Sequence, residues 1–185
     1  IMFMAGVNAL IGGMMGMNQS QLRTIMAYSS IGHMGWMLSL IAIQKPFASM
    51  LYFLIYSILI TPLFLSMWHF NIYSSKHMNK ISSCNLMLHL AMVTLLLSLG
   101  GLPPLTGFMP KLMTILMLSE TMKITVFMLI IGSVMNLFFY LNITINMMFS
   151  TPTLSISKYM KNNTSSIIIM STATMSLGLG PFIML

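Results

Sequence analysis

The sequence predicts an all-α polytopic membrane protein with about six transmembrane elements, one of which is a discontinuous helix. Hydrophobic residues make up 57% of the 185 residues and charged residues only 5%, too few charges to cover the surface of a soluble domain. Apolar runs separated by short polar breaks indicate the individual elements. These elements span about residues 1–17, 24–43, 48–70, 86–119, 124–149 and 164–184.

The first three runs and the fifth each have the length of a single membrane crossing, which takes about 20 apolar residues. Polar and turn-forming residues separate the runs, and Pro46 and Pro152 stand where helices are expected to begin or end. The connecting segments are residues 18–21, 44–46, 71–85, 119–123 and 150–163. No tandem repeat or soluble segment is visible, so residues 1–185 are predicted to form a single transmembrane domain.

The fourth run is too long for one straight crossing. As a continuous helix, residues 86–119 would extend about 50 Å, against a hydrocarbon core of about 30 Å. Helix-breaking residues cluster near its middle, and they are Gly100, Gly101, Pro103, Pro104, Gly107 and Pro110. The pattern favours two half-helices joined by an irregular segment at membrane depth. The alternative is a single helix that is steeply tilted and kinked.

Lys111 is the leading candidate for a functional side chain. It is the only basic residue well inside a predicted span, directly after the helix-breaking cluster. A lysine at the centre of a membrane helix costs roughly 3 kcal/mol on insertion scales, so such residues often line ion pathways. A lysine that alternates between charged and neutral forms can accept and release a proton, which predicts a proton relay. The alternative is a lysine that extends along its aliphatic stem to an interface.

Histidines and one asparagine add further candidates. His33 follows two serines in the second run, and a neutral imidazole can pass a proton along a water chain. A relay and a hydrogen-bonded structural role are both open for His33. His89 is a candidate for orienting water, although a structural role is favoured for it. Asn136 is a candidate for orienting water next to Lys111, although its four-residue spacing with Gly132 and Tyr140 is also typical of helix packing. His69 and His77 are expected at membrane interfaces.

Several site classes find no support in the sequence. The single Cys84 excludes an intrachain disulfide and any site built from several cysteines. No matched pair of histidines indicates a haem, and no phosphate loop or nucleophile triad is present. The net charge of +7 comes from scattered basic residues without a basic face, which favours a role in membrane topology over nucleic-acid binding. The chain opens on Ile1 inside an apolar run, so we expect its N-terminus to be incomplete.

Basic residues in the connectors predict an orientation. One side of the membrane would hold Arg23, Lys76, Lys80, Lys158 and Lys161, and the other Lys45 and Lys123, with Glu120 beside the latter. The side with five basic residues is predicted to be the cytoplasmic or matrix face.

Two long motifs resemble a known family. They are Asn18-Gln-Ser-Gln-Leu-Arg-Thr-Ile-Met-Ala-Tyr-Ser-Ser-Ile-Gly-His-Met-Gly-Trp-Met37 and the segment from Gly100 to Lys111. Both closely resemble the chain 2 family of mitochondrially encoded NADH–ubiquinone oxidoreductase, antiporter-like subunits in the membrane arm of respiratory complex I. The resemblance runs along essentially the whole chain. Thr24 departs from it, since the family commonly has a second basic residue after the position of Arg23.

The resemblance implies a fold and a function. Family members contain two inverted five-helix repeats, each with a discontinuous helix, so this chain resembles the C-terminal half: the second repeat plus a terminal helix, without the first repeat. Lys111 would be the terminal lysine of the proton path, with His33 on a preceding helix of the repeat. The implied function is proton translocation across the inner mitochondrial membrane, coupled to quinone reduction elsewhere in the enzyme.

The resemblance also implies partners and leaves alternatives. Other membrane-arm subunits and lipids are the expected partners, in a hetero-oligomer without nucleic acid. This chain is expected to carry no redox centre, because NADH, FMN, iron–sulfur clusters and ubiquinone would belong to partner subunits. A non-conducting structural subunit of the membrane arm is one alternative. Half of a stand-alone cation–proton antiporter is another.

Overall fold

The computed structural model describes residues 1–69, 86–103, 105–149 and 171–174, and this part of the chain is helical without strands. The helices are α1 (Met2–Met17), α2 (Leu22–Ala42), α3 (Pro46–His69), α5 (Leu86–Gly100), α6 (Phe108–Ser119) and α7 (Lys123–Phe149). The all-α prediction is confirmed for these residues. Of the predicted element at 164–184, only residues 171–174 are described, and they are helical. Pro104, His77 and Cys84 lie outside the described residues.

Among the described residues, three helices are long and apolar enough to cross a membrane. They are Leu22–Ala42, Pro46–Trp68 and Lys123–Phe149, and α1, α5 and α6 are shorter apolar helices. Large apolar side chains are exposed on the outside of the bundle, where a soluble protein would carry charges. Examples are Phe53, Leu116, Phe127, Val134 and Phe138. This surface suits contact with hydrocarbon, so the prediction of a multi-pass membrane protein is confirmed.

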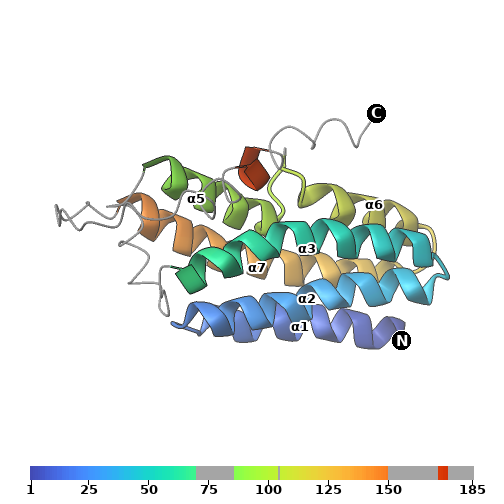
Figure 1. The fold of residues 1–185 in the computed structure, drawn as a ribbon. Coiled ribbons are helices and arrows are strands. Elements are labelled where there is room, and N and C mark those ends of the chain that lie inside the picture. The colour runs from blue at the N-terminus through green and yellow to red at the C-terminus, as the bar shows by residue number, and fades with distance from the viewer. Residues whose placement is uncertain (70–85, 104, 150–170, 175–185) are drawn as a thin grey trace.

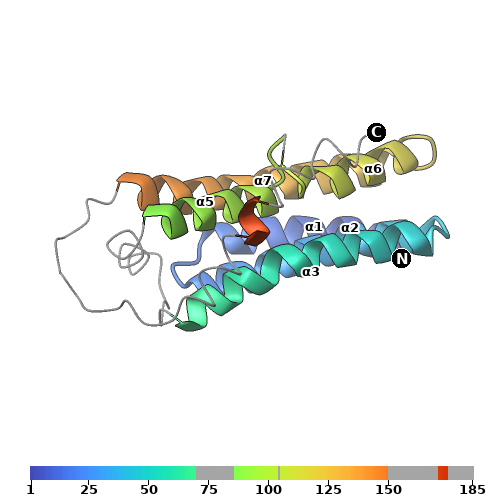
Figure 2. The same cartoon turned by 45° about the horizontal axis from the view of Figure 1, so that its top comes forward.

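The helices form an elongated bundle (Figure 1). Figure 2 shows α1, α2 and α3 in one layer and α5, α6 and α7 in the other. In both views α5 and α6 follow one another end to end beside α7 (Figures 1 and 2). The connections from α2 to α3 and from α6 to α7 lie at one end of the bundle, and the connection from α1 to α2 lies at the other.

Glycines let α1 approach α2 and α7 closely. A Cβ on Gly12 would lie 2.6 Å from the carbonyl oxygen of Tyr28 in α2. On the other side, a Cβ on Gly132 of α7 would overlap the carbonyl oxygen of Ala9. Small residues at these crossings bring helix backbones into direct contact, which is how helices associate in an apolar solvent.

Two apolar clusters occupy the two ends of the bundle. The first joins the start of α2 to the last turns of α3, to α5 and to the later part of α7, and its best buried members include Leu63, Met92, Leu95, Leu99 and Tyr140. The second joins α1 to the later part of α2, the start of α3, the end of α6 and the start of α7, with Ala9, Trp36, Leu40, Tyr52, Leu118 and Leu129. Along each helix, the residues between the two clusters mark the middle of the bundle.

The fourth predicted element consists of two helices. The helix α5 ends at Gly100 and α6 begins at Phe108, and the described residues between them, 101–103 and 105–107, are not helical. With 15 and 12 residues, the two helices are about 22 Å and 18 Å long, and neither alone crosses about 30 Å of hydrocarbon.

Candidate functional site

Polar side chains gather between the two apolar clusters. Buried there are Ser29 and His33 of α2, Asn136 of α7 and Lys111 at the start of α6. Each needs a partner, because an unpaired polar group in an apolar interior is unfavourable. The partners of Lys111 and His33 define the candidate site.

The C-terminal end of α5 is closed by glycine. Gly101 has φ +85°, a left-handed conformation that only glycine adopts readily. Its N–H donates to the carbonyl oxygen of Ser98 at 3.0 Å, and the N–H of Leu102 donates to that of Leu97 at 3.4 Å. This pair of hydrogen bonds is the Schellman arrangement, which satisfies two of the four carbonyls that a helix leaves free at its end.

Lys111 takes the two carbonyls that remain. Its Nζ donates to the carbonyl oxygen of Gly100 at 2.9 Å and, at a longer 3.4 Å, to that of Leu99. The side chain is only 5% exposed, so these contacts replace water. A cation at the negative end of the α5 dipole is also electrostatically favourable. Lys111 therefore joins the first turn of α6 to the last turn of α5.

The close fit around Lys111 depends on Gly101. A Cβ on Gly101 would lie 2.7 Å from Nζ of Lys111 and 3.1 Å from its Cδ. We call the interruption between the end of α5 at Gly100 and the start of α6 at Phe108 the break. Gly107 has a similar role on the other side of the break, because a Cβ there would overlap the carbonyl of Ser98. The glycines of the segment thus turn the chain and make room for the lysine and the end of α5.

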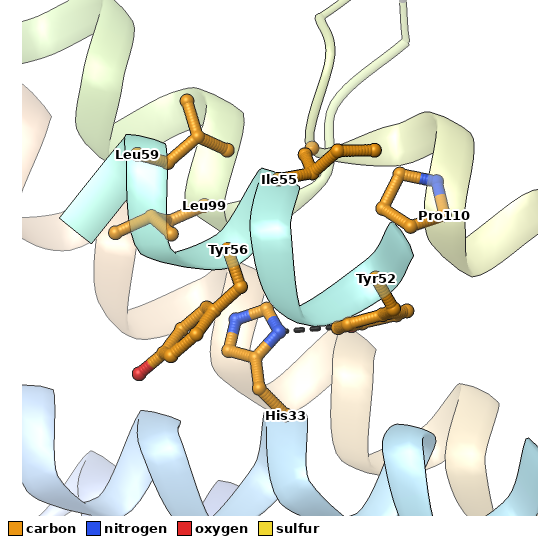
Figure 3. A pocket seen from close by; sticks show the side chains of 8 residues that line it. His33, Tyr52, Ile55, Tyr56, Leu59, Leu99 and Pro110 are labelled. Carbon is orange, nitrogen blue, oxygen red and sulfur yellow. Dashed lines mark hydrogen bonds between the residues drawn. The ribbon is translucent and has the colours of Figure 1, made fainter. Parts of the chain in front are cut away.

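His33 is held by two tyrosines of α3. Its Nδ1 and the hydroxyl of Tyr52 share a hydrogen bond of 2.9 Å, and its ring lies 4.8 Å from that of Tyr56, centroid to centroid. Figure 3 shows the imidazole between the two tyrosine rings. Within the described residues, Nε2 of His33 is buried and has no hydrogen-bond partner. One ring nitrogen is therefore fixed and the other remains available.

A small cavity lies next to this imidazole (Figure 3). Its volume is about 10 Å³, which is room for about one water. Its lining comes from α2, α3, α5, the break and α6, namely His33, Tyr52, Ile55, Tyr56, Leu59, Leu99, Gly107 and Pro110. The cavity therefore lies between His33 and the segment that precedes Lys111.

Asn136 and Tyr140 lie on the face of α7 toward α2 and α5. A Cβ on Gly32 would lie 2.6 Å from Nδ2 of Asn136, so the amide packs where α2 has no side chain. In the described part of the chain, Oδ1 of Asn136 is buried without a hydrogen-bond partner. The Tyr140 hydroxyl lies 3.6 Å from Sδ of Met26. Asn136 thus lies beside the residue that precedes His33, and its water-orienting role stays a prediction.

His89 lies near the start of α5, away from the break. Its Nε2 lies 3.1 Å from the carbonyl oxygen of Met147, in the last turn of α7. About eleven residues of helix, or roughly 16 Å, separate His89 from the end of α5. The structure therefore brings His33 and the break together and leaves His89 apart. The roles of Lys111 and His33 as relays stay predictions.

Tyr52 and Tyr56 are site residues that the sequence analysis missed. Their spacing of four residues places both on one face of α3, and each hydroxyl at that depth needs a partner. That spacing was the available signal. No group of three histidine, cysteine or acidic side chains in the described residues is arranged to hold a metal ion.

The fold and the buried polar layer define a class: multi-pass α-helical membrane proteins that keep ionisable side chains inside the bundle. The family described as NADH:quinone oxidoreductase/Mrp antiporter, TM, matches residues 1–138. The chain belongs to this family.

Curated relatives agree with this assignment. NADH-ubiquinone oxidoreductase chain 2 of Lumbricus terrestris is 57% identical over 182 residues, covering 98% of this chain and 54% of the relative. The same subunit of Pisaster ochraceus is 39% identical over 141 residues, covering 76% of this chain and 40% of that relative. The predicted resemblance is confirmed, and the chain spans about half the length of the curated relatives it matches.

A solved structure has the same fold. A chain of respiratory complex I from Thermus thermophilus, in a structure with bound aureothin, matches with a TM-score of 0.84 at 20% identity. The match covers 97% of this chain and 42% of the other.

Proposed function

We propose that this chain is part of a membrane-arm subunit of respiratory complex I, in the inner mitochondrial membrane, and that it contributes to proton translocation through Lys111. Membership of the family and 57% identity to a chain 2 subunit support the assignment to complex I. Other membrane-arm subunits and lipids are then its partners. In this proposal other subunits of the enzyme bind NADH, FMN, iron–sulfur clusters and ubiquinone. The redox reactions in those subunits drive the proton transfer through Lys111.

One observation carries the role of Lys111. The side chain is buried at a helix break and is bound by the carbonyls of Gly100 and Leu99. The only acidic residue in the sequence, Glu120, is exposed at the end of α6. Because carbonyls are neutral, Lys111 can give up its proton without leaving an unpaired carboxylate behind. This arrangement suits a group that gains and loses a proton within the bundle.

We propose further that α5 and α6 are the two halves of one discontinuous transmembrane helix. Their end-to-end course along α7 (Figures 1 and 2) supports this, as do their lengths. Irregular backbone at membrane depth needs partners inside the protein, and the hydrogen bonds of Gly101 and Lys111 supply them. The chain then corresponds to the second inverted repeat with a terminal helix, a plan common among transporters.

A structural role for Lys111 is the second candidate, and the same hydrogen bonds favour it. Lys111 closes the end of α5, so it can stabilise the break without moving protons, in a membrane-arm subunit that does not conduct. Arginine separates the two functions. Its guanidinium can donate to the same carbonyls, but it does not give up its proton in proteins.

The test uses the assembled complex with Lys111→Met, Lys111→Arg and, as a matched control, Lys45→Met at the exposed connection between α2 and α3. NADH oxidation, protons moved per electron and the amount of assembled complex are measured together. A relay predicts that both Lys111 variants assemble and pump less, while Lys45→Met behaves as wild type. Normal pumping by Lys111→Arg, with poor assembly of Lys111→Met, would establish the structural role instead.

Unchanged pumping by a fully assembled Lys111→Met complex would refute both roles. The alternative that this chain is half of a stand-alone cation–proton antiporter predicts a different result. The purified chain in liposomes should then exchange protons for a cation.

A further inference from the structure

His33 has one ring nitrogen in use and one available. The hydrogen bond to Tyr52 occupies Nδ1, and Tyr56 lies against the ring. The side chain is 4% exposed, and Nε2 has no partner among the described residues. An unpaired buried nitrogen is unfavourable unless a further group binds it.

The cavity beside His33 can hold that group. About 10 Å³ is the space of a single water, and a buried water needs two to four polar partners. The available ones are Nε2 of His33 and the backbone of Gly107, which has no side chain and so lines the cavity with main-chain atoms. Isoleucine, leucine and proline side chains make up most of the remaining lining.

The hydroxyl of Tyr52 suits a histidine that changes its protonation. A hydroxyl can either donate or accept a hydrogen bond. When Nδ1 carries hydrogen, it donates to the Tyr52 oxygen, and Nε2 can take up a proton from the water without disturbing that bond. When the proton leaves Nε2, the same bond remains. Proton gain and loss are thereby confined to Nε2, the nitrogen on the side of Tyr56 in Figure 3.

We propose that Tyr52 is a positioning residue that fixes the His33 imidazole with Nε2 toward a single bound water in this cavity, next to the break that presents Lys111. The proposal rests on the proposed function, because it makes His33 a second protonatable group on the proton path of Lys111. In this proposal Tyr52 acts through the imidazole of His33.

A double-mutant cycle on the assembled complex tests this role. Tyr52→Phe removes only the hydroxyl, His33→Gln removes the imidazole, and Tyr28→Phe on α2 is the matched control for loss of a tyrosine hydroxyl outside the cavity. We expect Tyr52→Phe to lower proton pumping about 2- to 10-fold, the equivalent of one hydrogen bond, while the amount of assembled complex stays at the wild-type level. Adding Tyr52→Phe to His33→Gln should then change nothing more, because the two act as a unit.

Additive effects of the two variants, or pumping by Tyr52→Phe equal to that of Tyr28→Phe, would overturn the proposal. In either case a loss of pumping in Lys111→Met would leave the proposed function standing. Normal pumping in Lys111→Met would instead refute the proposed function, whatever Tyr52→Phe does.

A second measurement does not depend on whether the variants assemble. A density map of the wild-type complex at a resolution that shows other buried waters should show one water within hydrogen-bond distance of Nε2 of His33. A dry cavity in such a map would overturn the proposal.

Discussion

Nζ of Lys111 donates a hydrogen bond of 2.9 Å to the carbonyl oxygen of Gly100. This contact joins two helices across a non-helical segment and connects a buried cation to the end of a helix dipole. The lysine is thus both part of the structure of the break and the candidate for proton transfer. Variants that separate these two contributions are the most informative.

Lys111→Met should lower the stability of the break, whether or not Lys111 takes part in proton pumping. It leaves the carbonyls of Leu99 and Gly100 without the Nζ donor, at a cost of about 1–3 kcal/mol for buried groups that lose their hydrogen bond. Lys111→Arg should recover most of this loss. Thermal unfolding of the purified complex, monitored by the release of this chain, measures the difference in stability between the variants. Equal melting temperatures for wild type and Lys111→Met would show that the carbonyls find other partners.

Gly101→Ala should displace Lys111. The residue has φ +85°, which costs a non-glycine residue roughly 1–2 kcal/mol, and its new Cβ would lie 2.7 Å from Nζ. Gly100→Ala is the matched control, because a Cβ there meets nothing closer than 3.8 Å. Stability and pumping should fall in Gly101→Ala and stay near wild type in Gly100→Ala. The same result for both neighbours would contradict the importance of the left-handed turn.

Sequence alone was enough to place the described membrane helices. The run predicted at 24–43 is the helix Leu22–Ala42, and the run at 48–70 is Pro46–His69, because apolar length and the polar connectors set these bounds. The cluster of glycine and proline likewise indicated the separation of α5 from α6. These features depend on local chemistry, which a sequence shows directly.

The side-chain partners on different helices could not be predicted from the sequence. His33 and Tyr52 are 19 residues apart, and their pairing depends on how α2 and α3 pack. The same holds for Asn136, whose amide lies against Gly32 of α2. The carbonyl partners of Lys111 likewise depend on how the start of α6 packs against the end of α5.

Gly132→Ala should weaken the contact between α1 and α7. The new Cβ would overlap the backbone carbonyl of Ala9, and backbone cannot move aside without shifting a helix, so a cost of about 1–3 kcal/mol is expected. Gly6→Ala is the control on the same interface, since its Cβ would meet the flexible end of Met128 at 2.9 Å. The yield of assembled complex on a native gel compares them. Equal yields would mean that the helices adjust freely.

His89→Phe should lower stability without changing protons moved per electron. The substitution removes the contact between Nε2 and the carbonyl oxygen of Met147, which is worth about 1 kcal/mol, and it lies far from the break. His89→Gln can donate to the same carbonyl and should recover part of the loss. Melting temperature and the proton-to-electron ratio are measured on the same preparation. A lower ratio in a fully assembled His89→Phe complex would place His89 on the proton path, because a contact between α5 and the last turn of α7 has no other reason to change pumping.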